Sequence, residues 1–231
     1  NWLNQAMEDR QSEVRAAIMF VRDRYQFTKS QIGLLGFSQA GWVLPALADG
    51  SEDVGFIVGI GFATNWIEQG KYYRSVRLEK EGKSDVEIAD SLARYSQELA
   101  ILRQKLSFER YMNQIKASGM SEDRYTFVLK NFESNARHDY SNIKVPSLFI
   151  WGEEDLNVDA IEEYKWWQSN RSRFVSTKLI SNASHGLLDA DSFDSQRIGF
   201  GSWLKLMWEG ENAFAKDFFP TLLAWLYLRY E

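Results

Sequence analysis

Apolar and polar residues follow two different rhythms along the chain, and the change of rhythm predicts the order of helices and strands. Between residues 13 and 25, apolar side chains recur at steps of three and four, which places one apolar stripe on a helix. Residues 32–37, IGLLGF, are a short unbroken apolar run, typical of a strand covered on both faces. The pattern therefore predicts an amphipathic helix followed by a buried parallel strand.

The same alternation continues toward the C-terminus. Residues 39–49 resume a helical pattern, although Pro45 is awkward there because a proline inside a helix cannot donate one of the backbone hydrogen bonds. Further strands are expected at residues 53–64, 145–155 and 174–181, and a last helix near residues 212–229. Helices that alternate with apolar strands are typical of an α/β fold with a mostly parallel sheet flanked by helices.

The stretch between the second and third expected strands has a different character. It contains no proline between Pro45 and Pro146, and Ser84 with Glu87 forms a capping box at the start of a helical pattern. We expect residues 66–140 to be a helical insertion, and residues 1–65 and 141–231 to form the core of the fold. The insertion is either a cap or lid over a substrate or a set of purely structural helices.

Composition limits the classes of function. The net charge is −5 and the sequence pI about 5.3, which gives no electrostatic reason to bind nucleic acid or an anionic membrane. Cysteine is absent, so disulfides, thiolate catalysis and cysteine-ligated zinc are excluded. No apolar stretch is long enough to span a bilayer. A soluble protein is expected, and the compartment is left open with a cytoplasmic location as the first choice.

Ser38 lies where the run of residues 32–37 meets the following helix, with Gly36, Ala40 and Gly41 around it. Small neighbours permit the strained turn that lifts a nucleophilic serine above the edge of a sheet. The backbone N–H of Gln39 would then point toward a developing oxyanion at the positive end of the helix. A plain strand-to-helix turn is the alternative interpretation.

A nucleophilic serine needs a base, and the chain offers two histidines. His185 follows the last expected strand in NASHGLLD, whereas His138 ends the charged helical stretch and is expected at the surface. Loops that follow parallel strands lie at the carboxyl edge of the sheet, where such folds bind ligands. His185 is therefore the candidate base.

The base needs a carboxylate to orient it, and Asp155 ends the strand-like run FIWGEED. An aspartate that merely caps a loop is the alternative, and three other carboxylates compete with it nearby: Glu153, Glu154 and Asp159. Three residues that each follow a strand, in the order serine, aspartate, histidine, match the order of the triad in α/β-hydrolases.

Four segments of the sequence carry a resemblance to bacterial α/β-hydrolase esterases, near the dienelactone hydrolase and prolyl-oligopeptidase-like branches. They are KSQIGLLGFSQAGWVLPALA, DVGFIVGIGFAT, VPSLFIWGEEDLNVD and NASHGLLD. The resemblance implies that Ser38 is the nucleophile, Asp155 the acid and His185 the base, with the Gln39 backbone as one oxyanion donor. Relatives often have a proline at the position of Pro45.

Two departures from that family stand out. Ala40 replaces the usual second glycine of the elbow. The family also has four strands and a helix ahead of the helix at residues 13–25, and a loop of that part supplies the other oxyanion N–H. We expect the 231 residues to be the C-terminal part of such a fold, with the sheet completed by a missing N-terminal segment or by a second chain. A half-fold without activity is the third possibility.

The leading functional hypothesis is a serine hydrolase that cleaves carboxylic esters through an acyl-enzyme, without cofactor or metal. Four aromatic residues suggest an apolar acyl or aromatic ester substrate: Trp42 beside the elbow, and Trp66, Tyr72 and Tyr73 at the start of the insertion. Core packing is the favoured explanation for any one of them taken singly. Thioesterase, lipase, amidase and peptidase activity share this triad and are not distinguished. The alternative is a truncated, non-catalytic domain that binds a ligand or partner. A dinucleotide site is disfavoured because GLLGFSQAG lacks the G-x-G-x-x-G spacing.

Overall fold

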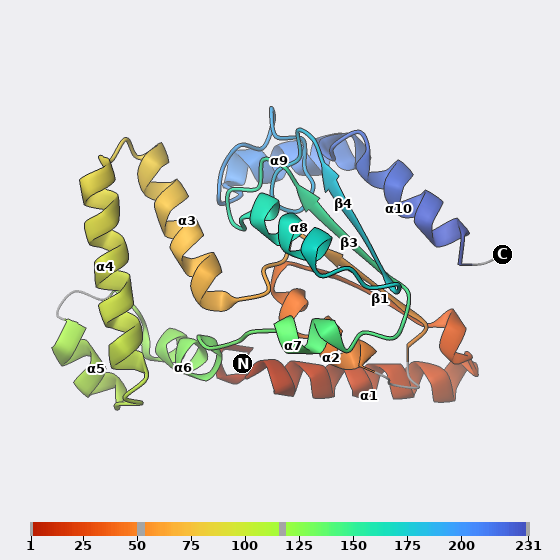
Figure 1. Ribbon diagram of the computed structural model, residues 1–231, viewed down its shortest axis with the longest axis horizontal. Coiled ribbons are helices and arrows are strands. Elements are labelled where there is room, and N and C mark those ends of the chain that lie inside the picture. Colours follow the sequence, from red (N-terminus) through yellow and green to blue (C-terminus); the bar gives the residue numbers. More distant parts are fainter. Residues whose placement is uncertain (1, 50–53, 116–118, 230–231) are drawn as a thin grey trace.

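The computed structural model describes residues 2–49, 54–115 and 119–229 (Figure 1). Its sheet has four strands in the order β1-β2-β3-β4, and every neighbouring pair is parallel. The strands are β1 (Gly33–Phe37), β2 (Phe56–Ile60), β3 (Ser147–Gly152) and β4 (Val175–Ile180). The predicted α/β class with a parallel sheet flanked by helices is confirmed. The expected start of the second strand at Asp53 lies outside the described residues.

Helices cover both faces of this sheet, but unequally. On one face, Phe149 and Trp151 of β3 share an apolar cluster with residues of α1 (Met7–Tyr25), α2 (Leu44–Ala48), α7 (Arg137–Ser141) and α8 (Ala160–Ser169). On the other face, Leu148 and Ile150 of β3 pack with α10 (Phe218–Tyr227). Figure 1 shows α8 and α10 on opposite sides of β3 and β4. The central strands are thus buried on both sides, as the unbroken apolar runs require.

The expectation that residues 32–37 are covered on both faces was wrong. β1 is the edge strand of the sheet, and exposed and half-buried residues alternate along it. Leu35 is 50% and Phe37 43% exposed, and they pair in register with Val58 and Ile60 on the face that α10 covers. That cover does not extend over β1, because α10 packs against the neighbouring strands.

Pro45 causes no irregularity in the segment that follows β1. A 3₁₀ helix runs over Ser38–Trp42, and α2 begins only at Leu44. Pro45 therefore falls in the first turn of α2, where a backbone N–H would have no partner within the helix. The single helix expected over residues 39–49 is two short helices.

The last helix also starts later than expected. α10 begins at Phe218, so Pro220 lies in its first turn. The residues before α10 are held by the loop after β4, which contains His185. The Ala215 N–H donates to the Leu187 carbonyl, and the Asp189 N–H donates to the Ala213 carbonyl, both at 2.9 Å. These long-range hydrogen bonds replace the helical ones that the sequence pattern suggested.

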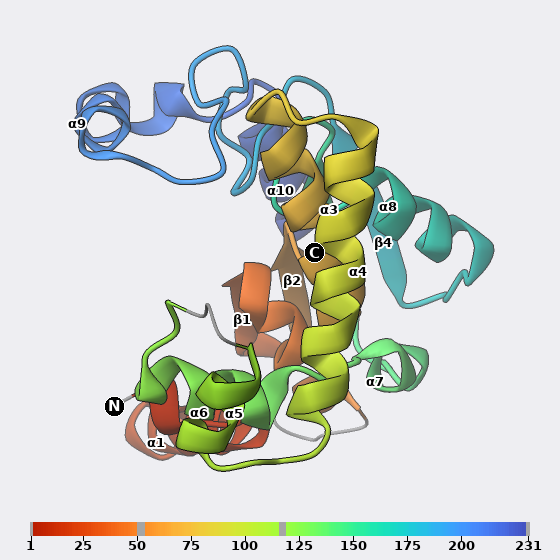
Figure 2. The same cartoon turned by 90° about the vertical axis from the view of Figure 1, so that its left-hand side faces the viewer.

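The stretch after β2 is helical. It contains α3 (Trp66–Lys80), α4 (Asp85–Leu102), α5 (Phe108–Ile115) and α6 (Glu122–Asn131). The capping box of Ser84 and Glu87 starts α4, and α3 and α4 run side by side in both views (Figures 1 and 2). Leu99, Leu102 and Tyr111 centre an apolar cluster of these helices. Whether they act as a cap over a substrate stays a prediction.

One helix was not expected at all. α9 (Phe200–Glu209) has no buried residue, and Figure 2 shows it set apart from the sheet. Phe200, Met207 and Trp208 are among its exposed apolar side chains. Within the described ranges, no helix is both long and apolar enough to cross a membrane.

Candidate active site

Ser38 stands directly after β1 in a strained backbone conformation. Its φ of 50° lies in the left-handed region, which non-glycine residues rarely occupy. The chain doubles back so tightly that a Cβ on Gly36 would collide with the Cβ of Ala40 and lie 3.1 Å from Leu44 Cδ1. The small residues around Ser38 are therefore required by this turn, which has the geometry expected of a nucleophile elbow.

Asp155 and His185 are in direct contact. Asp155 Oδ2 lies 2.8 Å from His185 Nδ1, and the carboxylate is buried while the imidazole is partly exposed. The other oxygen, Oδ1, accepts hydrogen bonds from the backbone N–H groups of Asn157 at 2.7 Å and Val158 at 2.9 Å. An ionised carboxylate can only accept, so in the contact with Oδ2 the neutral imidazole donates a proton carried on Nδ1. Nε2 is then left as an acceptor.

Gly61 connects this pair to Ser38. β1 and β2 pair Phe37 with Ile60, so Ser38 and Gly61 occupy the next positions at the carboxyl ends of neighbouring strands. A Cβ on Gly61, whose φ is +55°, would lie 3.5 Å from both Asp155 Oδ2 and His185 Nδ1. The aspartate–histidine pair therefore sits over the end of β2, one strand from Ser38. The parallel sheet brings the three predicted residues to the same edge.

A groove of about 840 Å³ opens beside Ser38. Its lining comes from the N-terminal segment, α1, β1 and the elbow, and includes Trp2, Arg10, Leu35, Phe37, Gln39 and Leu44. The Gln39 side chain accepts a hydrogen bond from Arg10 Nη1 at 3.3 Å, which ties the elbow to α1. The groove therefore lies along the uncovered edge strand and adjoins Ser38 at one end.

Trp42 and Trp66, suggested as substrate-binding residues, do not line this groove. Trp42 is 5% exposed and donates from Nε1 to the Thr64 carbonyl at 3.3 Å. The centroids of the two indole rings are 5.0 Å apart, and Trp66 packs between the sheet core and the helical insertion. In this structure both tryptophans act as packing residues.

The competing residues are placed differently from the predicted triad. His138 is exposed on α7, as expected, and Glu153 and Glu154 are exposed as well. Asp159 accepts from the Glu162 N–H at 3.0 Å and caps α8. Among these carboxylates and histidines, the pair that meets at the sheet edge is Asp155 and His185.

Sequence reasoning missed how the insertion is fixed to the aspartate loop. The Tyr72 hydroxyl, on α3, donates to the Asp155 carbonyl at 2.8 Å. Gln69 Nε2, one turn earlier, reaches the Asn157 carbonyl at 3.5 Å, and Gln196 Nε2 donates to the Leu156 carbonyl at 2.7 Å. Three successive carbonyls of the loop are thus held by side chains, and nothing in the local sequence indicated these contacts.

The same tyrosine has a perturbed pKa. Burial, followed by the charges of Asp159 and Asp155, raises the pKa of Tyr72 to about 12. Its hydroxyl therefore stays protonated and remains a donor to the Asp155 carbonyl across the physiological range. As to metals, the part of the chain that the structure describes holds no group of three or more His, Asp or Glu side chains that could bind an ion.

Comparisons with known proteins found similar chains only among solved structures. No protein family model matches the sequence, and no curated protein matches it either. Among solved structures, the chain aligns with an esterase from Pyrococcus furiosus at TM-score 0.44 and 18% identity, over 75% of this chain and 52% of the esterase. The chain thus spans about half the length of that esterase.

Two further solved structures align over more of their length. An alpha/beta fold family hydrolase from Bacillus anthracis aligns at TM-score 0.45 and 16% identity, over 76% of this chain and 68% of that one. MenH from S. aureus aligns at TM-score 0.42 and 16% identity, over 87% of this chain and 75% of MenH. At these scores the alignments are similarities only, and the assignment to a dienelactone hydrolase branch stays a prediction.

Proposed function

We propose that this chain carries the catalytic triad of a serine hydrolase that cleaves carboxylic esters. Ser38 is the nucleophile, His185 the general base and Asp155 the residue that orients it. The observation that carries the proposal is the 2.8 Å contact between His185 Nδ1 and the buried Asp155, on a chain whose Ser38 has a φ of 50° one strand away. Packing alone gives no reason to combine a strained serine with an oriented imidazole.

The proposed reaction uses these three residues in turn. Ser38 Oγ attacks the acyl carbonyl while its proton passes to His185 Nε2, and the imidazolium is stabilised by Asp155. The backbone N–H of Gln39 donates to the oxyanion. His185 then protonates the departing alkoxide, which leaves an acyl-enzyme. Water, deprotonated by His185, attacks this ester and releases the carboxylic acid and free Ser38.

The test is the intact mass of the natural protein before and after treatment with a fluorophosphonate probe. The proposal requires a single adduct that is absent in Ser38→Ala. Ser30→Ala is the matched control, because Ser30 lies just before β1 and should leave labelling unchanged. A natural protein that acquires no adduct, or an adduct that persists in Ser38→Ala, would overturn the proposal.

A second candidate function is favoured by the edge strand. Among the described residues no strand pairs with the outer edge of β1, and Leu35 and Phe37 are exposed beside Ser38. An edge strand whose backbone groups are unpaired and whose apolar side chains are exposed is a template for pairing with another strand. We infer that a further strand-bearing segment, from a longer chain or a second one, docks there. In this second candidate function the chain is a non-catalytic, hydrolase-like domain that binds a partner through β1.

This docking is tested by the association state of the isolated 231 residues. Leu35→Lys should reduce concentration-dependent self-association in light scattering, because a charged side chain blocks pairing along the strand edge. Val86→Lys is the control. Val86 is 71% exposed on α4, so this substitution adds the same charge away from the sheet. Equal association of both variants and the unmodified chain would contradict a docking role for β1.

A further inference from the structure

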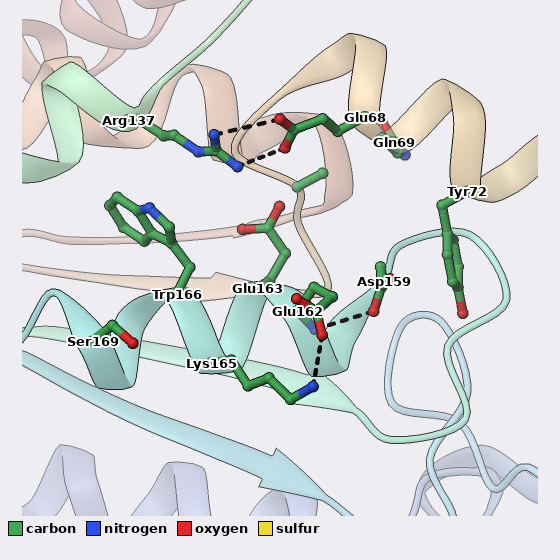
Figure 3. A pocket seen from close by; sticks show the side chains of 11 residues that line it. Glu68, Gln69, Tyr72, Arg137, Asp159, Glu162, Glu163, Lys165, Trp166 and Ser169 are labelled. Carbon is green, nitrogen blue, oxygen red and sulfur yellow. Dashed lines mark hydrogen bonds and ion pairs between the residues drawn. The ribbon is translucent and has the colours of Figure 1, made fainter.

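A second cavity lies away from Ser38, between α3, α7 and α8 (Figure 3). Its volume is about 470 Å³, within the range of small-molecule sites. Tyr72 and Trp166 supply aromatic wall, Ala63 supplies apolar wall, and charged side chains supply most of the rest. None of these residues belongs to the proposed triad.

Most of the charges around this cavity are already paired. Arg137 forms an ion pair with Glu68, and Lys165 Nζ lies 2.6 Å from Glu162 Oε1. Asp159 accepts the backbone N–H of Glu162 and so caps α8. Figure 3 shows the two ion pairs on either side of the cavity. Glu68 and Glu162 are thus ion-paired and Asp159 caps a helix, which leaves one further carboxylate.

That carboxylate belongs to Glu163, which is 8% exposed. Its Oε1 accepts from the Thr64 N–H at 2.9 Å and from the Thr64 hydroxyl at 3.2 Å. Its Oε2 is buried and has no hydrogen-bond partner. A buried carboxylate oxygen without a donor is costly, and the few that occur in folded proteins call for an explanation such as a ligand.

We propose that this cavity binds a small organic cation with a primary ammonium group, which donates to Glu163 Oε2. Four carboxylates and two basic side chains line the cavity, so its field favours a cation over an anion. The Trp166 ring and the methyl group of Ala63 suit a short aliphatic tail, which would share the ring with the Arg137 guanidinium, 5.9 Å from its centroid. The proposal does not depend on the hydrolase activity.

We expect side-chain movement to open the way to Oε2. The Arg137 and Glu68 side chains, which interact with Glu163, are 36% and 55% exposed, and Arg137 Nε would give up its 3.2 Å hydrogen bond to the Thr64 hydroxyl. In Figure 3 the Glu163 carboxylate points toward the space between Trp166 and this ion pair. An ammonium group entering from that side meets Oε2 while Oε1 keeps its bonds to Thr64.

The test is calorimetric titration of the protein with n-butylammonium, n-butanol and butyrate. The ammonium should bind in the millimolar range or tighter, and the neutral and anionic analogues should bind at least about tenfold more weakly. Glu163→Gln keeps an oxygen for Thr64 and should weaken ammonium binding by at least about tenfold. Glu109→Gln, the same change at an exposed position of α5 outside the cavity, should weaken it by less than about threefold.

A second measurement uses the unmodified protein alone. Burial raises the pKa of Glu163 to about 7, and Arg137, Glu68 and Tyr140 are the other titratable groups that interact with it. Because the ammonium binds the ionised carboxylate, its affinity should rise about tenfold between pH 6 and pH 8. Binding that is absent at about 50 mM ligand, equal in the two glutamate variants, as strong for butanol or butyrate, or flat with pH would overturn the proposal.

Discussion

The Tyr72 hydroxyl donates a 2.8 Å hydrogen bond to the backbone carbonyl of Asp155, 83 residues further along the chain. A helix of the insertion thus holds the loop whose carboxylate orients His185. The bond acts on the backbone and leaves both carboxylate oxygens free for Asn157, Val158 and the imidazole. This makes Tyr72 a positioning residue for the proposed triad.

Tyr72→Phe should lower kcat for ester hydrolysis by about threefold to tenfold with little change in KM, because the imidazole is held less well while the Ser38 groove is untouched. The loss of one hydrogen bond should also reduce the free energy of unfolding by about 1 kcal/mol. Tyr73→Phe is the control, since the contact of Tyr73 with Gln196 uses its backbone carbonyl. A larger effect on KM than on kcat would assign Tyr72 to substrate binding instead.

Asp155→Asn should lower kcat by about four orders of magnitude while the fold is kept, because an amide in this position favours the wrong tautomer of His185. Glu153→Gln and Glu154→Gln remove charges from the same loop at exposed positions and should leave kcat within about twofold. The measurement is steady-state hydrolysis of an aromatic ester. If Asp155→Asn retained more than about a tenth of the activity, the role assigned to Asp155 would be wrong.

Gly36→Ala should lower the free energy of unfolding by about 1–3 kcal/mol, because the new methyl group collides with Ala40 and crowds Leu44. The double variant Gly36→Ala with Ala40→Gly removes the first of these contacts and should recover part of the loss. Urea unfolding of both single variants and the double variant measures the coupling between the two positions. Strict additivity would show that the tight elbow does not impose the small residue at position 36.

The buried Glu163 makes stability depend on pH. Its pKa rises from 4.5 to about 7 on folding, so the folded state binds more protons than the unfolded state between these values. The associated stabilisation is complete below pH 4.5 and is lost as pH rises through about 7, with a magnitude of up to about 3 kcal/mol. Glu163→Gln cannot ionise and should lack this loss.

The two proteins should therefore have similar stability near pH 5, and Glu163→Gln should be the more stable above pH 7. Urea unfolding in amine-free buffers between pH 5 and pH 8 measures the difference. Glu162→Gln serves as the control, because Glu162 is exposed and is the neighbouring glutamate on the same helix. A pH-independent difference between the unmodified protein and Glu163→Gln would contradict the raised pKa.

The sequence by itself determined the alternation of helices with the central strands and the order of the proposed triad. Apolar runs predicted β2 and β3, because a strand between two helical layers must be apolar on both faces. Ser38, Asp155 and His185 could be chosen because each follows a strand, and parallel strands end at one edge. These conclusions depend only on which residues lie next to one another in the sequence, and the pattern of apolar and polar residues shows that directly.

Only the tertiary structure decided which side chains are covered and by what. The apolar run of β1 does not reveal that it forms the sheet edge, since cover depends on α10 nearly 200 residues away. Trp42 lies in the core and not in a groove, because it contacts Thr64 and Trp66, which are more than 20 residues away in the sequence. Glu163 gained its partner Thr64 across 99 residues of sequence, and its second oxygen was left without one. Burial and pairing are properties of distant contacts, and periodicity along the chain carries no record of them.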